Sequence, residues 1–156
     1  MSGATISNCK KYRYQLWHIW DESKPKVLFI MLNPSLAESE KNNPTVKRCI
    51  NFAKSWGYGG LYVGNLYAYR TAYPKELKKA GYLKGEENIR HLREMGKESE
   101  LIICAWGVFG VTKSNNTEWV FSLFEKLHYL ALSKDEIPRH PLYLKKDLKP
   151  IPFKVE

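Results

Sequence analysis

The stretch KVLFIMLNPS, residues 26–35, decides the fold. Residues 26–32 form a continuous apolar run bounded by Pro25 and Pro34, which is typical of a central strand buried on both faces. Asn33 and Pro34 then stop the strand abruptly. The chain either turns here because Asn-Pro is a common turn signal, or it brings a polar side chain to the rigid end of a strand, where sites are usually built.

Strands and helices alternate on both sides of this run. Asn43 is a candidate N-cap for a helix that has Pro44 in its first turn and is ended by Gly57. A second, short helix is expected after Pro74. The other predicted elements are strands at 12–20, 60–69, 100–107 and 128–133 and helices at 85–99 and 116–127.

Buried strands that alternate with helices predict a parallel sheet covered on both faces. We therefore expect an α/β protein with a single domain, residues 1–156. The expected fold is a three-layer α/β/α sandwich with a mainly parallel central sheet of about four strands. Its core is expected to span residues 12–153 after a short N-terminal tail, with the strand at 12–20 as a candidate antiparallel edge.

The composition limits the class of protein. The N-terminus has no apolar h-region and no apolar run approaches the length of a membrane span, so we expect a cytoplasmic protein with no membrane partner. The three cysteines, Cys9, Cys49 and Cys104, form no CxxC pair. The four histidines show no metal-ligand spacing with them, so we expect no metal and no cofactor.

The charge favours a polyanionic partner. Lysines and arginines outnumber acidic residues 25 to 16, which gives a formal net charge of +9. Aromatic residues make up 13% of the chain, and basic residues interleaved with tyrosine and tryptophan suit base stacking beside phosphate contacts. The alternative is that aromatic residues fill the core while lysines keep the surface soluble. Composition alone favours neither.

Polar residues gather where the predicted strands end. Because sites of parallel sheets lie beyond the carboxyl ends of the strands, these residues are expected to share one rim. Each also has a structural alternative: Asn33 as a turn former, Asn65 as a hydrogen-bonded structural amide, His140 as an ordinary loop residue. The predicted rim consists of Asn33, Pro34, Ser35, Asn65, Trp106, Gly107, Arg139, His140 and Pro141.

The order and spacing of five motifs carry two resemblances. The chain looks like a member of an uncharacterised bacterial and phage family, DUF1643, over about residues 12–153. It also resembles the uracil-DNA glycosylase superfamily, in which one strand ends in an Asn-Pro motif, the next carries an Asn, a third ends in a Gly-containing turn, and a His-Pro motif follows late. The motifs are YRYQLWHIW (12–20), FIMLNPS (29–35), GYGGLYVGNLYAYR (57–70), AWG (105–107) and RHPLYL (139–144).

The glycosylase resemblance implies a set of roles. Asn33, fixed by Pro34, would position water at the sugar carbon, and neutral His140 would donate to the leaving base. Asn65 has both a donor and an acceptor with which to read the edge of a pyrimidine in DNA. Further base-binding residues would be Pro34, Ser35, Tyr67 and Trp106, with Tyr69 as a second stacking candidate.

Three positions depart from the glycosylase pattern. Met31 and Ser35 stand where glycosylases of the Asn type carry glycine, and Leu142 follows His140-Pro141 in place of serine. The changed glycines alter how closely the backbone can approach a base, and the changed serine removes a phosphate contact. These departures bear on which base is accepted rather than on the fold.

Three functions from different classes follow. The first is a DNA glycosylase that flips out and removes uracil or a modified pyrimidine, with DNA as its partner. The second is a noncatalytic module that binds nucleic acid or a nucleotide. The third is a phage or host interaction protein that uses its basic face on an acidic partner. The candidate nucleic-acid contacts are Arg48, Arg70, Arg139, Lys145 and Lys146, although the lysines, with Lys149, also suit a solvated face.

Overall fold

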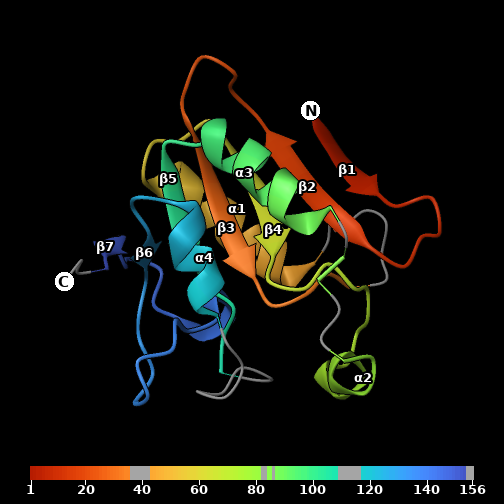
Figure 1. Cartoon of the computed structure of the whole chain (residues 1–156). Helices are drawn as coiled ribbons and strands as arrows, with labels where there is room; N and C mark the ends of the chain where they lie inside the picture. The colour runs from red at the N-terminus through yellow and green to blue at the C-terminus, as the bar shows by residue number, and fades with distance from the viewer. Residues whose placement is uncertain (36–42, 82–83, 86, 109–116, 154–156) are drawn as a thin grey trace.

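The computed structural model describes residues 1–35, 43–81, 84–85, 87–108 and 117–153. Within these ranges, one mixed sheet runs through the middle of the molecule and helices lie against both of its faces (Figure 1). The predicted helix at 116–127 begins at a residue outside the described ranges, and the structure forms α4 over Glu118–Leu123.

The apolar run forms the central strand, β3 (Lys26–Met31). It pairs in parallel with β4 (Gly60–Asn65) on one side and with β5 (Leu101–Cys104) on the other. Its side chains from residue 27 onward are buried, alternately toward the two faces of the sheet. A strand covered on both sides needs a continuous apolar sequence, and this requirement explains why the run was so clear in the sequence.

The complete sheet has seven strands in the order β1-β2-β4-β3-β5-β6-β7. The pairs β3·β4, β3·β5 and β5·β6 are parallel, whereas β1·β2, β2·β4 and β6·β7 are antiparallel. The remaining strands are β1 (Ser2–Ile6), β2 (Arg13–Ile19), β6 (His128–Tyr129) and β7 (Ile151–Pro152).

The expected sheet of about four mainly parallel strands is therefore wrong, and so is the glycosylase-like fold description that rested on it. The segment expected to be a tail supplies β1, which forms an edge strand paired to β2. The strand at 12–20 is not an edge, because β1 covers its outer side. Edge strands bury little surface, so their sequences carry weak apolar patterning, and β1 and β7 had no signal to reveal them.

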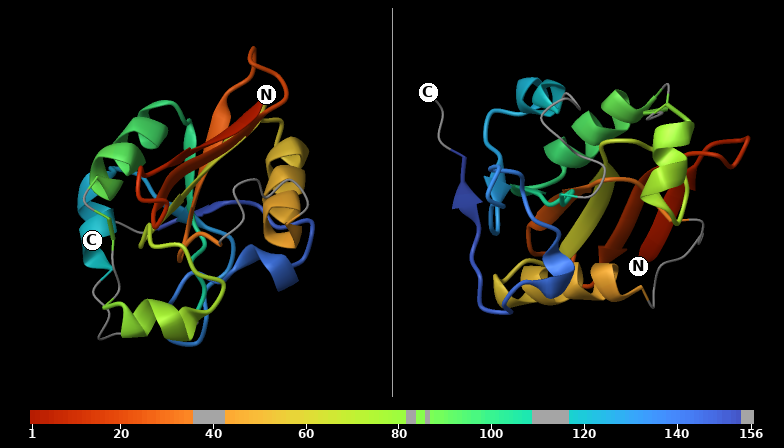
Figure 2. Two further views of the ribbon diagram at one scale, coloured as in Figure 1. Left: turned by 90° about the vertical axis from the view of Figure 1, so that its right-hand side faces the viewer. Right: turned by 90° about the horizontal axis from the view of Figure 1, so that it is seen from below.

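One face of the sheet is covered by α1 (Pro44–Ser55). The side chain of Asn43 accepts hydrogen bonds from the backbone N–H groups of Thr45 and Val46, which confirms the predicted N-cap. The buried side of the helix packs against the side chains of β3 that point the same way, such as Phe29. Figure 2 shows α1 on the side of the sheet opposite α3 and α4.

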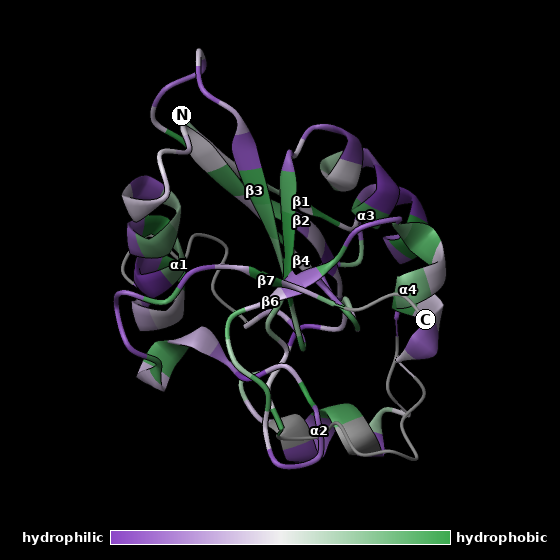
Figure 3. Ribbon diagram, turned by 90° about the vertical axis from the view of Figure 1, so that its left-hand side faces the viewer, coloured by the Kyte–Doolittle hydropathy of each residue, from purple (hydrophilic) through white to green (hydrophobic). Residues whose placement is uncertain are grey.

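The other face is covered by α3 (Asn88–Lys97) and α4. Leu92, Met95 and Val120 pack there against Leu28 and the other side chains of the sheet that face this way. The short helix predicted after Pro74 forms α2 (Pro74–Lys79), which lies beyond the end of the sheet (Figure 1). The hydropathy colouring of Figure 3 places the apolar strand β3 between the helices of the two faces.

The parallel strands all end at one edge of the sheet, where α2 and the segment with the short 3-10 helix η1 (Pro141–Tyr143) are found (Figure 1). This edge is the place where α/β proteins build their sites. None of the helices in the described ranges combines the length and apolar character that a membrane span requires.

Candidate functional site

A cavity of about 710 Å³ opens at the carboxyl edge of the sheet. Its volume lies within the range of small-molecule sites, roughly 300–1,000 Å³. β3 and β4 reach it directly, and the chain that follows β5 forms another wall. Seven of the residues predicted to gather on the rim line this cavity: Asn33, Ser35, Asn65, Trp106, Gly107, Arg139 and His140.

Asn33 is held by its own amide nitrogen. Nδ2 donates to the backbone carbonyl oxygens of Thr71 at 2.9 Å, Pro34 at 3.1 Å and Tyr69 at 3.4 Å. Three surrounding acceptors fix the orientation of the amide, because Oδ1 could not face them. Asn33 therefore ties together two segments of the cavity wall, and the group it has left to offer a ligand is the acceptor Oδ1.

Asn65 is the last residue of β4 and lies opposite Met31 in the parallel ladder. Its side chain is 2% exposed, and within the described residues its Nδ2 has no hydrogen-bond partner. Leaving a buried donor unpaired costs about 1–3 kcal/mol. Its backbone carbonyl, by contrast, accepts from Asn88 Nδ2 at 2.8 Å. A buried amide donor at the wall of a cavity suits a ligand that brings its own acceptor.

His140 reaches the cavity from the segment after β6. Its Nδ1 accepts from the backbone N–H of Leu142 at 3.2 Å, so in the neutral ring the proton lies on Nε2. Burial lowers the pKa of His140 from its ordinary value of 6.5. At neutral pH the ring is therefore an uncharged donor, as its predicted role requires.

Lowering the pH should destabilise the protein through its histidines. Because the pKa of His140 is lower in the folded protein than in the unfolded chain, the unfolded chain takes up a proton first below about pH 6.5. Burial also lowers the pKa values of His91 and His128. We expect the free energy of unfolding to fall between pH 7 and pH 5 in urea titrations. His140→Gln should remove part of that slope, and an unchanged slope would contradict the assignment.

Gly107 positions His140. Its φ of +81° is in the left-handed region that favours glycine, and its N–H donates to the carbonyl of Pro138 at 2.9 Å. A Cβ added at Gly107 would lie 3.1 Å from the Cβ of His140. The turn after β5 therefore lies so close to His140 that a side chain at position 107 would crowd it.

Gly107→Ala should lower the free energy of unfolding by about 1–2 kcal/mol through backbone strain and also displace His140. Gly57→Ala is the matched control, because Gly57 has a similar φ of +85° with nothing within 4 Å of the added Cβ. We expect the His140 pKa, measured by NMR titration, to move back toward 6.5 in Gly107→Ala alone. An equal pKa in both variants would show that the contact does not position the ring.

Pro34 and Trp106 support the cavity from the core. Pro34 is buried, and its carbonyl accepts from the N–H of Thr71 at 3.0 Å as well as from Asn33. Trp106 lines the cavity but is almost fully buried, with its ring packed in the cluster under α3 and α4. It can form an apolar wall for a ring, whereas Pro34 holds the loop in place.

Tyr67 does not line the cavity. The chain leaves the ladder after Asn65, so strand alternation no longer applies, and the ring of Tyr67 is buried in the core beside Leu66. Its expected role in base stacking has no support from this position. Tyr69 is likewise absent from the lining and packs edge-on against Tyr12.

Four of the five predicted nucleic-acid contacts lie outside the cavity lining. Arg70 is buried, and it donates to the carbonyls of Lys10 at 2.9 Å and Ser35 at 3.5 Å, so it clamps loops instead of facing solvent. The guanidinium of Arg48 lies over the ring of Phe52. Lys145 and Lys146 are exposed in the C-terminal segment, and Arg139 is both exposed and part of the lining.

Sequence reasoning missed Arg13. This side chain is 2% exposed and lines the cavity. β2 runs antiparallel to β4, so the start of β2 lies beside the carboxyl ends of the parallel strands. Only the strand order brings Arg13 to the site. The exposed Tyr143 of η1 was also missed, although its position three residues after His140 placed it close by.

The described residues contain no cluster of three or more His, Cys, Asp or Glu side chains that could hold a metal ion. Cys49 and Cys104 are buried, and burial strongly raises the pKa of the Cys104 thiol. The polar groups of the described cavity lining are amides, hydroxyls, guanidinium groups, one imidazole, one indole and the thiol of Cys49. Such a set binds through hydrogen bonds and positive charge.

The chain belongs to the family described as protein of unknown function (DUF1643), whose model matches residues 13–142. This match confirms one of the two resemblances inferred from the motifs. No curated protein and no solved structure matches the chain. The matched span runs from Arg13 to Leu142 and so includes the strand ends and the His-Pro segment that together form the cavity.

Proposed function

We propose that this member of the DUF1643 family binds a pyrimidine in the cavity and hydrolyses its N-glycosidic bond. This is the chemistry of the uracil-DNA glycosylase superfamily that its motifs resemble. One observation carries the proposal: the buried Nδ2 of Asn65, unpaired within the described residues, shares one cavity with Asn33 and His140. A donor, an acceptor and a neutral imidazole are the groups that this reaction needs.

Recognition of the base falls to Asn65. Pyrimidines carry carbonyl acceptors beside a ring N–H or an amino group, and an amide can pair with such an edge through Nδ2 and Oδ1 together. The gain in binding free energy is large, because the ligand pairs with a donor that is already buried and, within the described residues, unpaired in the free protein. Trp106 and Met31 provide apolar walls for the ring.

The bond cleavage would proceed with charge separation. The C1′–N1 bond breaks, its electron pair leaves on the base, and the oxygen of a water molecule forms the new bond to C1′. Oδ1 of Asn33 accepts a hydrogen bond from this water, and Nε2–H of His140 donates to the base oxygen on which negative charge develops. The proton lost by the water passes to solvent and the base takes one up, so the products are the free base and a sugar with a hydroxyl at C1′.

The departures from the glycosylase motifs face the same cavity. Met31, Ser35 and Leu142 all contribute to its lining. Side chains now occupy space that glycine leaves open, and Leu142 replaces a hydroxyl with an apolar group. We therefore propose that these three side chains change which pyrimidine, uracil or a modified one, the cavity accepts.

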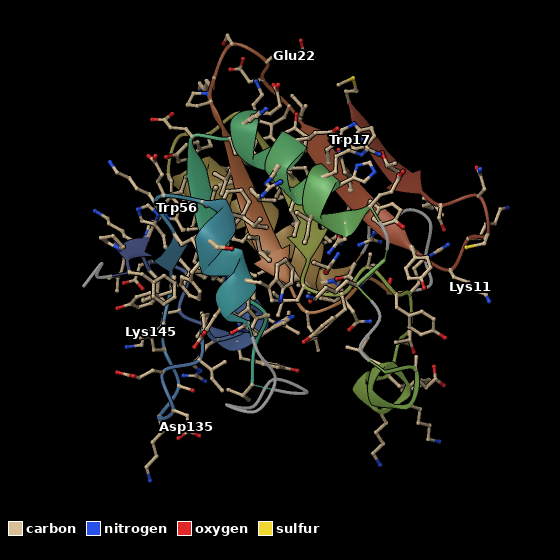
Figure 4. The ribbon with its side chains drawn as sticks, in the orientation of Figure 1. Lys11, Trp17, Glu22, Trp56, Asp135 and Lys145 are labelled. Atoms are coloured by element: carbon tan, nitrogen blue, oxygen red, sulfur yellow. The ribbon has the colours of Figure 1, made fainter. Side chains whose placement is uncertain are left out.

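DNA is the proposed carrier of the base. Lys145, Lys146 and Lys149 are exposed in the segment that follows η1. Figure 4 shows Lys145 toward the same end of the molecule as Asp135 and away from Glu22, which is the end where the parallel strands finish. These exposed lysines suit contacts to a phosphate backbone, and with a net charge of +9 for the whole chain, binding should weaken as salt rises.

A noncatalytic binding module is the second candidate. One observation favours it: within the described residues, no aspartate or glutamate lines the cavity to take the proton of the attacking water. An amide can orient water but cannot act as a strong base. The module would keep the recognition by Asn65 and the basic surface without the chemistry.

A base-release screen separates the two candidates. The protein is incubated with DNAs that contain uracil, thymine, cytosine or hypermodified pyrimidines, and free bases are detected by mass spectrometry. We expect release of at least one base and its loss in His140→Gln, with Asn51→Ala, an exposed amide of α1, as the unaffected control. Salt-sensitive DNA binding without any released base would support the noncatalytic module instead.

A further inference from the structure

We propose that the cavity contains a phosphate subsite built on Arg13, and that its ligand is a nucleotide with a terminal phosphate monoester. The proposal rests on the proposed function in taking a pyrimidine as the base. It adds a group of the substrate that no glycosylase-like motif assigns. A guanidinium is a planar cation with five N–H donors and matches the oxygens of a phosphate group in pairs.

Arg13 is the most deeply buried charged side chain of the cavity lining within the described residues. It is 2% exposed, and its backbone N–H is fixed by the carbonyl of Ala68 at 3.0 Å. Burying a cation is costly unless its charge is compensated. Arg13 has other contacts within the protein as well, and its five donors allow it to keep those and bind a ligand from the cavity side.

The charge of the lining favours an anion. Arg13 and Arg139 both contribute to it, and no aspartate or glutamate does so among the described residues. α1 begins at the same wall, through Thr45 and Val46, and its first turn holds no acidic residue. Asn43 already caps the first N–H groups, so α1 adds the positive end of its dipole and no free donors.

One residue of the lining, Thr71, contacts a carboxylate. The hydroxyl of Thr71 donates to Glu76, which is itself exposed and is not part of the lining. This contact uses one oxygen of a solvated carboxylate. Among the described residues, it adds no carboxylate to the lining of the cavity.

Asn65 is an independent argument for a ligand in the cavity interior. Its unpaired donor and the guanidinium of Arg13 lie on neighbouring strands, β4 and β2, and each side chain is only 2% exposed. A single ligand that contacts both would bring a neutral acceptor for Asn65 and an anion for the guanidinium of Arg13. A pyrimidine nucleotide has these two groups on one small molecule.

The depth at which Arg13 is buried favours a terminal phosphate monoester over a phosphodiester. A phosphodiester within a strand continues as polymer on both sides, so it stays at the mouth of a cavity, where the exposed Arg139 lies. A terminal monoester has no chain beyond it and can enter as far as Arg13. Two sources have this chemistry: a free nucleoside 5′-monophosphate and the 5′-phosphorylated end of a DNA strand.

Calorimetry with matched probes tests the subsite. The probes are thymidine, deoxycytidine and deoxyuridine, each with its 5′-monophosphate, together with inorganic phosphate. We expect the preferred monophosphate to bind at least about 30-fold more tightly than its nucleoside, since charged hydrogen bonds to a buried guanidinium supply the difference. Equal affinities in the wild-type protein would overturn the proposal without any variant.

Variants then locate the phosphate contact. Arg13→Lys keeps the charge but loses the paired geometry, and we expect it to lose about tenfold in nucleotide affinity with nucleoside affinity unchanged. Arg93→Gln, at an exposed arginine of α3, is the control and should bind like wild type. An unchanged ratio in folded Arg13→Lys would assign the phosphate to another cation. Short DNAs with and without a 5′-phosphate distinguish the strand end from the free nucleotide.

The two proposals fail in different ways. If the protein releases bases from DNA but binds nucleosides and nucleotides equally, the phosphate subsite is wrong and the glycosidic function stands. If nucleotides bind through Arg13 but no base is released from nucleotide or DNA, the subsite stands and the hydrolytic function is wrong.

Discussion

Asn33→Asp should lower the free energy of unfolding by about 3 kcal/mol and abolish binding at the cavity. In the wild-type protein Nδ2 of Asn33 donates to the carbonyls of Pro34, Tyr69 and Thr71. A carboxylate is nearly the same size but has no hydrogen to donate. Its oxygen would face three carbonyl oxygens, which adds repulsion and removes the donor shared by all three, although the carbonyl of Pro34 still accepts from the N–H of Thr71.

The size of the change in the free energy of unfolding shows whether Asn33 holds the cavity wall through its hydrogen bonds or is an ordinary turn residue. Asn33→Ala removes the donor without adding charge, so its cost should be smaller, about 1–2 kcal/mol. Asn51→Asp, on the exposed side of α1, makes the same chemical change and should stay within about 0.5 kcal/mol of wild type. Urea unfolding measures all three. A stable Asn33→Asp would mean that the three hydrogen bonds do not hold the wall.

This double use of Asn33 changes what its mutation can report. The motif alone suggested a choice between a turn former and a group that acts on water. The structure gives Nδ2 to the backbone and leaves Oδ1 at the cavity, so one side chain serves both purposes. Loss of base release in Asn33→Ala is therefore informative only beside its stability, because a loosened wall also removes activity.

The parts of the fold that could be predicted are those with a strong physical requirement. β3 must be apolar throughout because both of its faces are covered, and α1 must begin where Asn43 and Pro44 stop the preceding chain. β1 meets no such requirement, since it pairs along one side and buries little. Its five residues have no pattern distinct from that of a loop, so the sequence predicts a tail where the structure has a strand.

The site was predictable to the extent that it depends on strand ends. Asn33, Asn65 and Trp106 follow three parallel neighbours, so topology alone brings them to one edge. Arg13 depends on an antiparallel strand inserted beside β4, which no local pattern reveals. The prediction of a stacking role for Tyr67 has no support for a related reason. The two-residue alternation of a strand holds only while the chain stays in the ladder.

Asn65→Leu should bind ligand at least about 100-fold less tightly while the protein becomes no less stable. The side chain is buried, and Nδ2 finds no partner within the described residues, so its loss removes a cost instead of a bond. Leucine is of similar size and needs no hydrogen bonds. A residue whose removal costs function but not stability is placed for a ligand, and natural sites often carry this trade-off.

The neighbouring Asn88 provides the matched control, because it is equally buried but its Nδ2 donates to the carbonyls of Asn65 at 2.8 Å and Leu66 at 3.3 Å. Asn88→Leu should therefore lower the free energy of unfolding by about 2 kcal/mol or more, since it leaves two buried carbonyls without this donor. Asn65→Asp should bind a different base if it folds, since it presents acceptors where wild type presents a donor. If urea unfolding shows Asn65→Leu to be as damaging as Asn88→Leu, Asn65 is a structural amide and the recognition of a base must be sought elsewhere in the cavity.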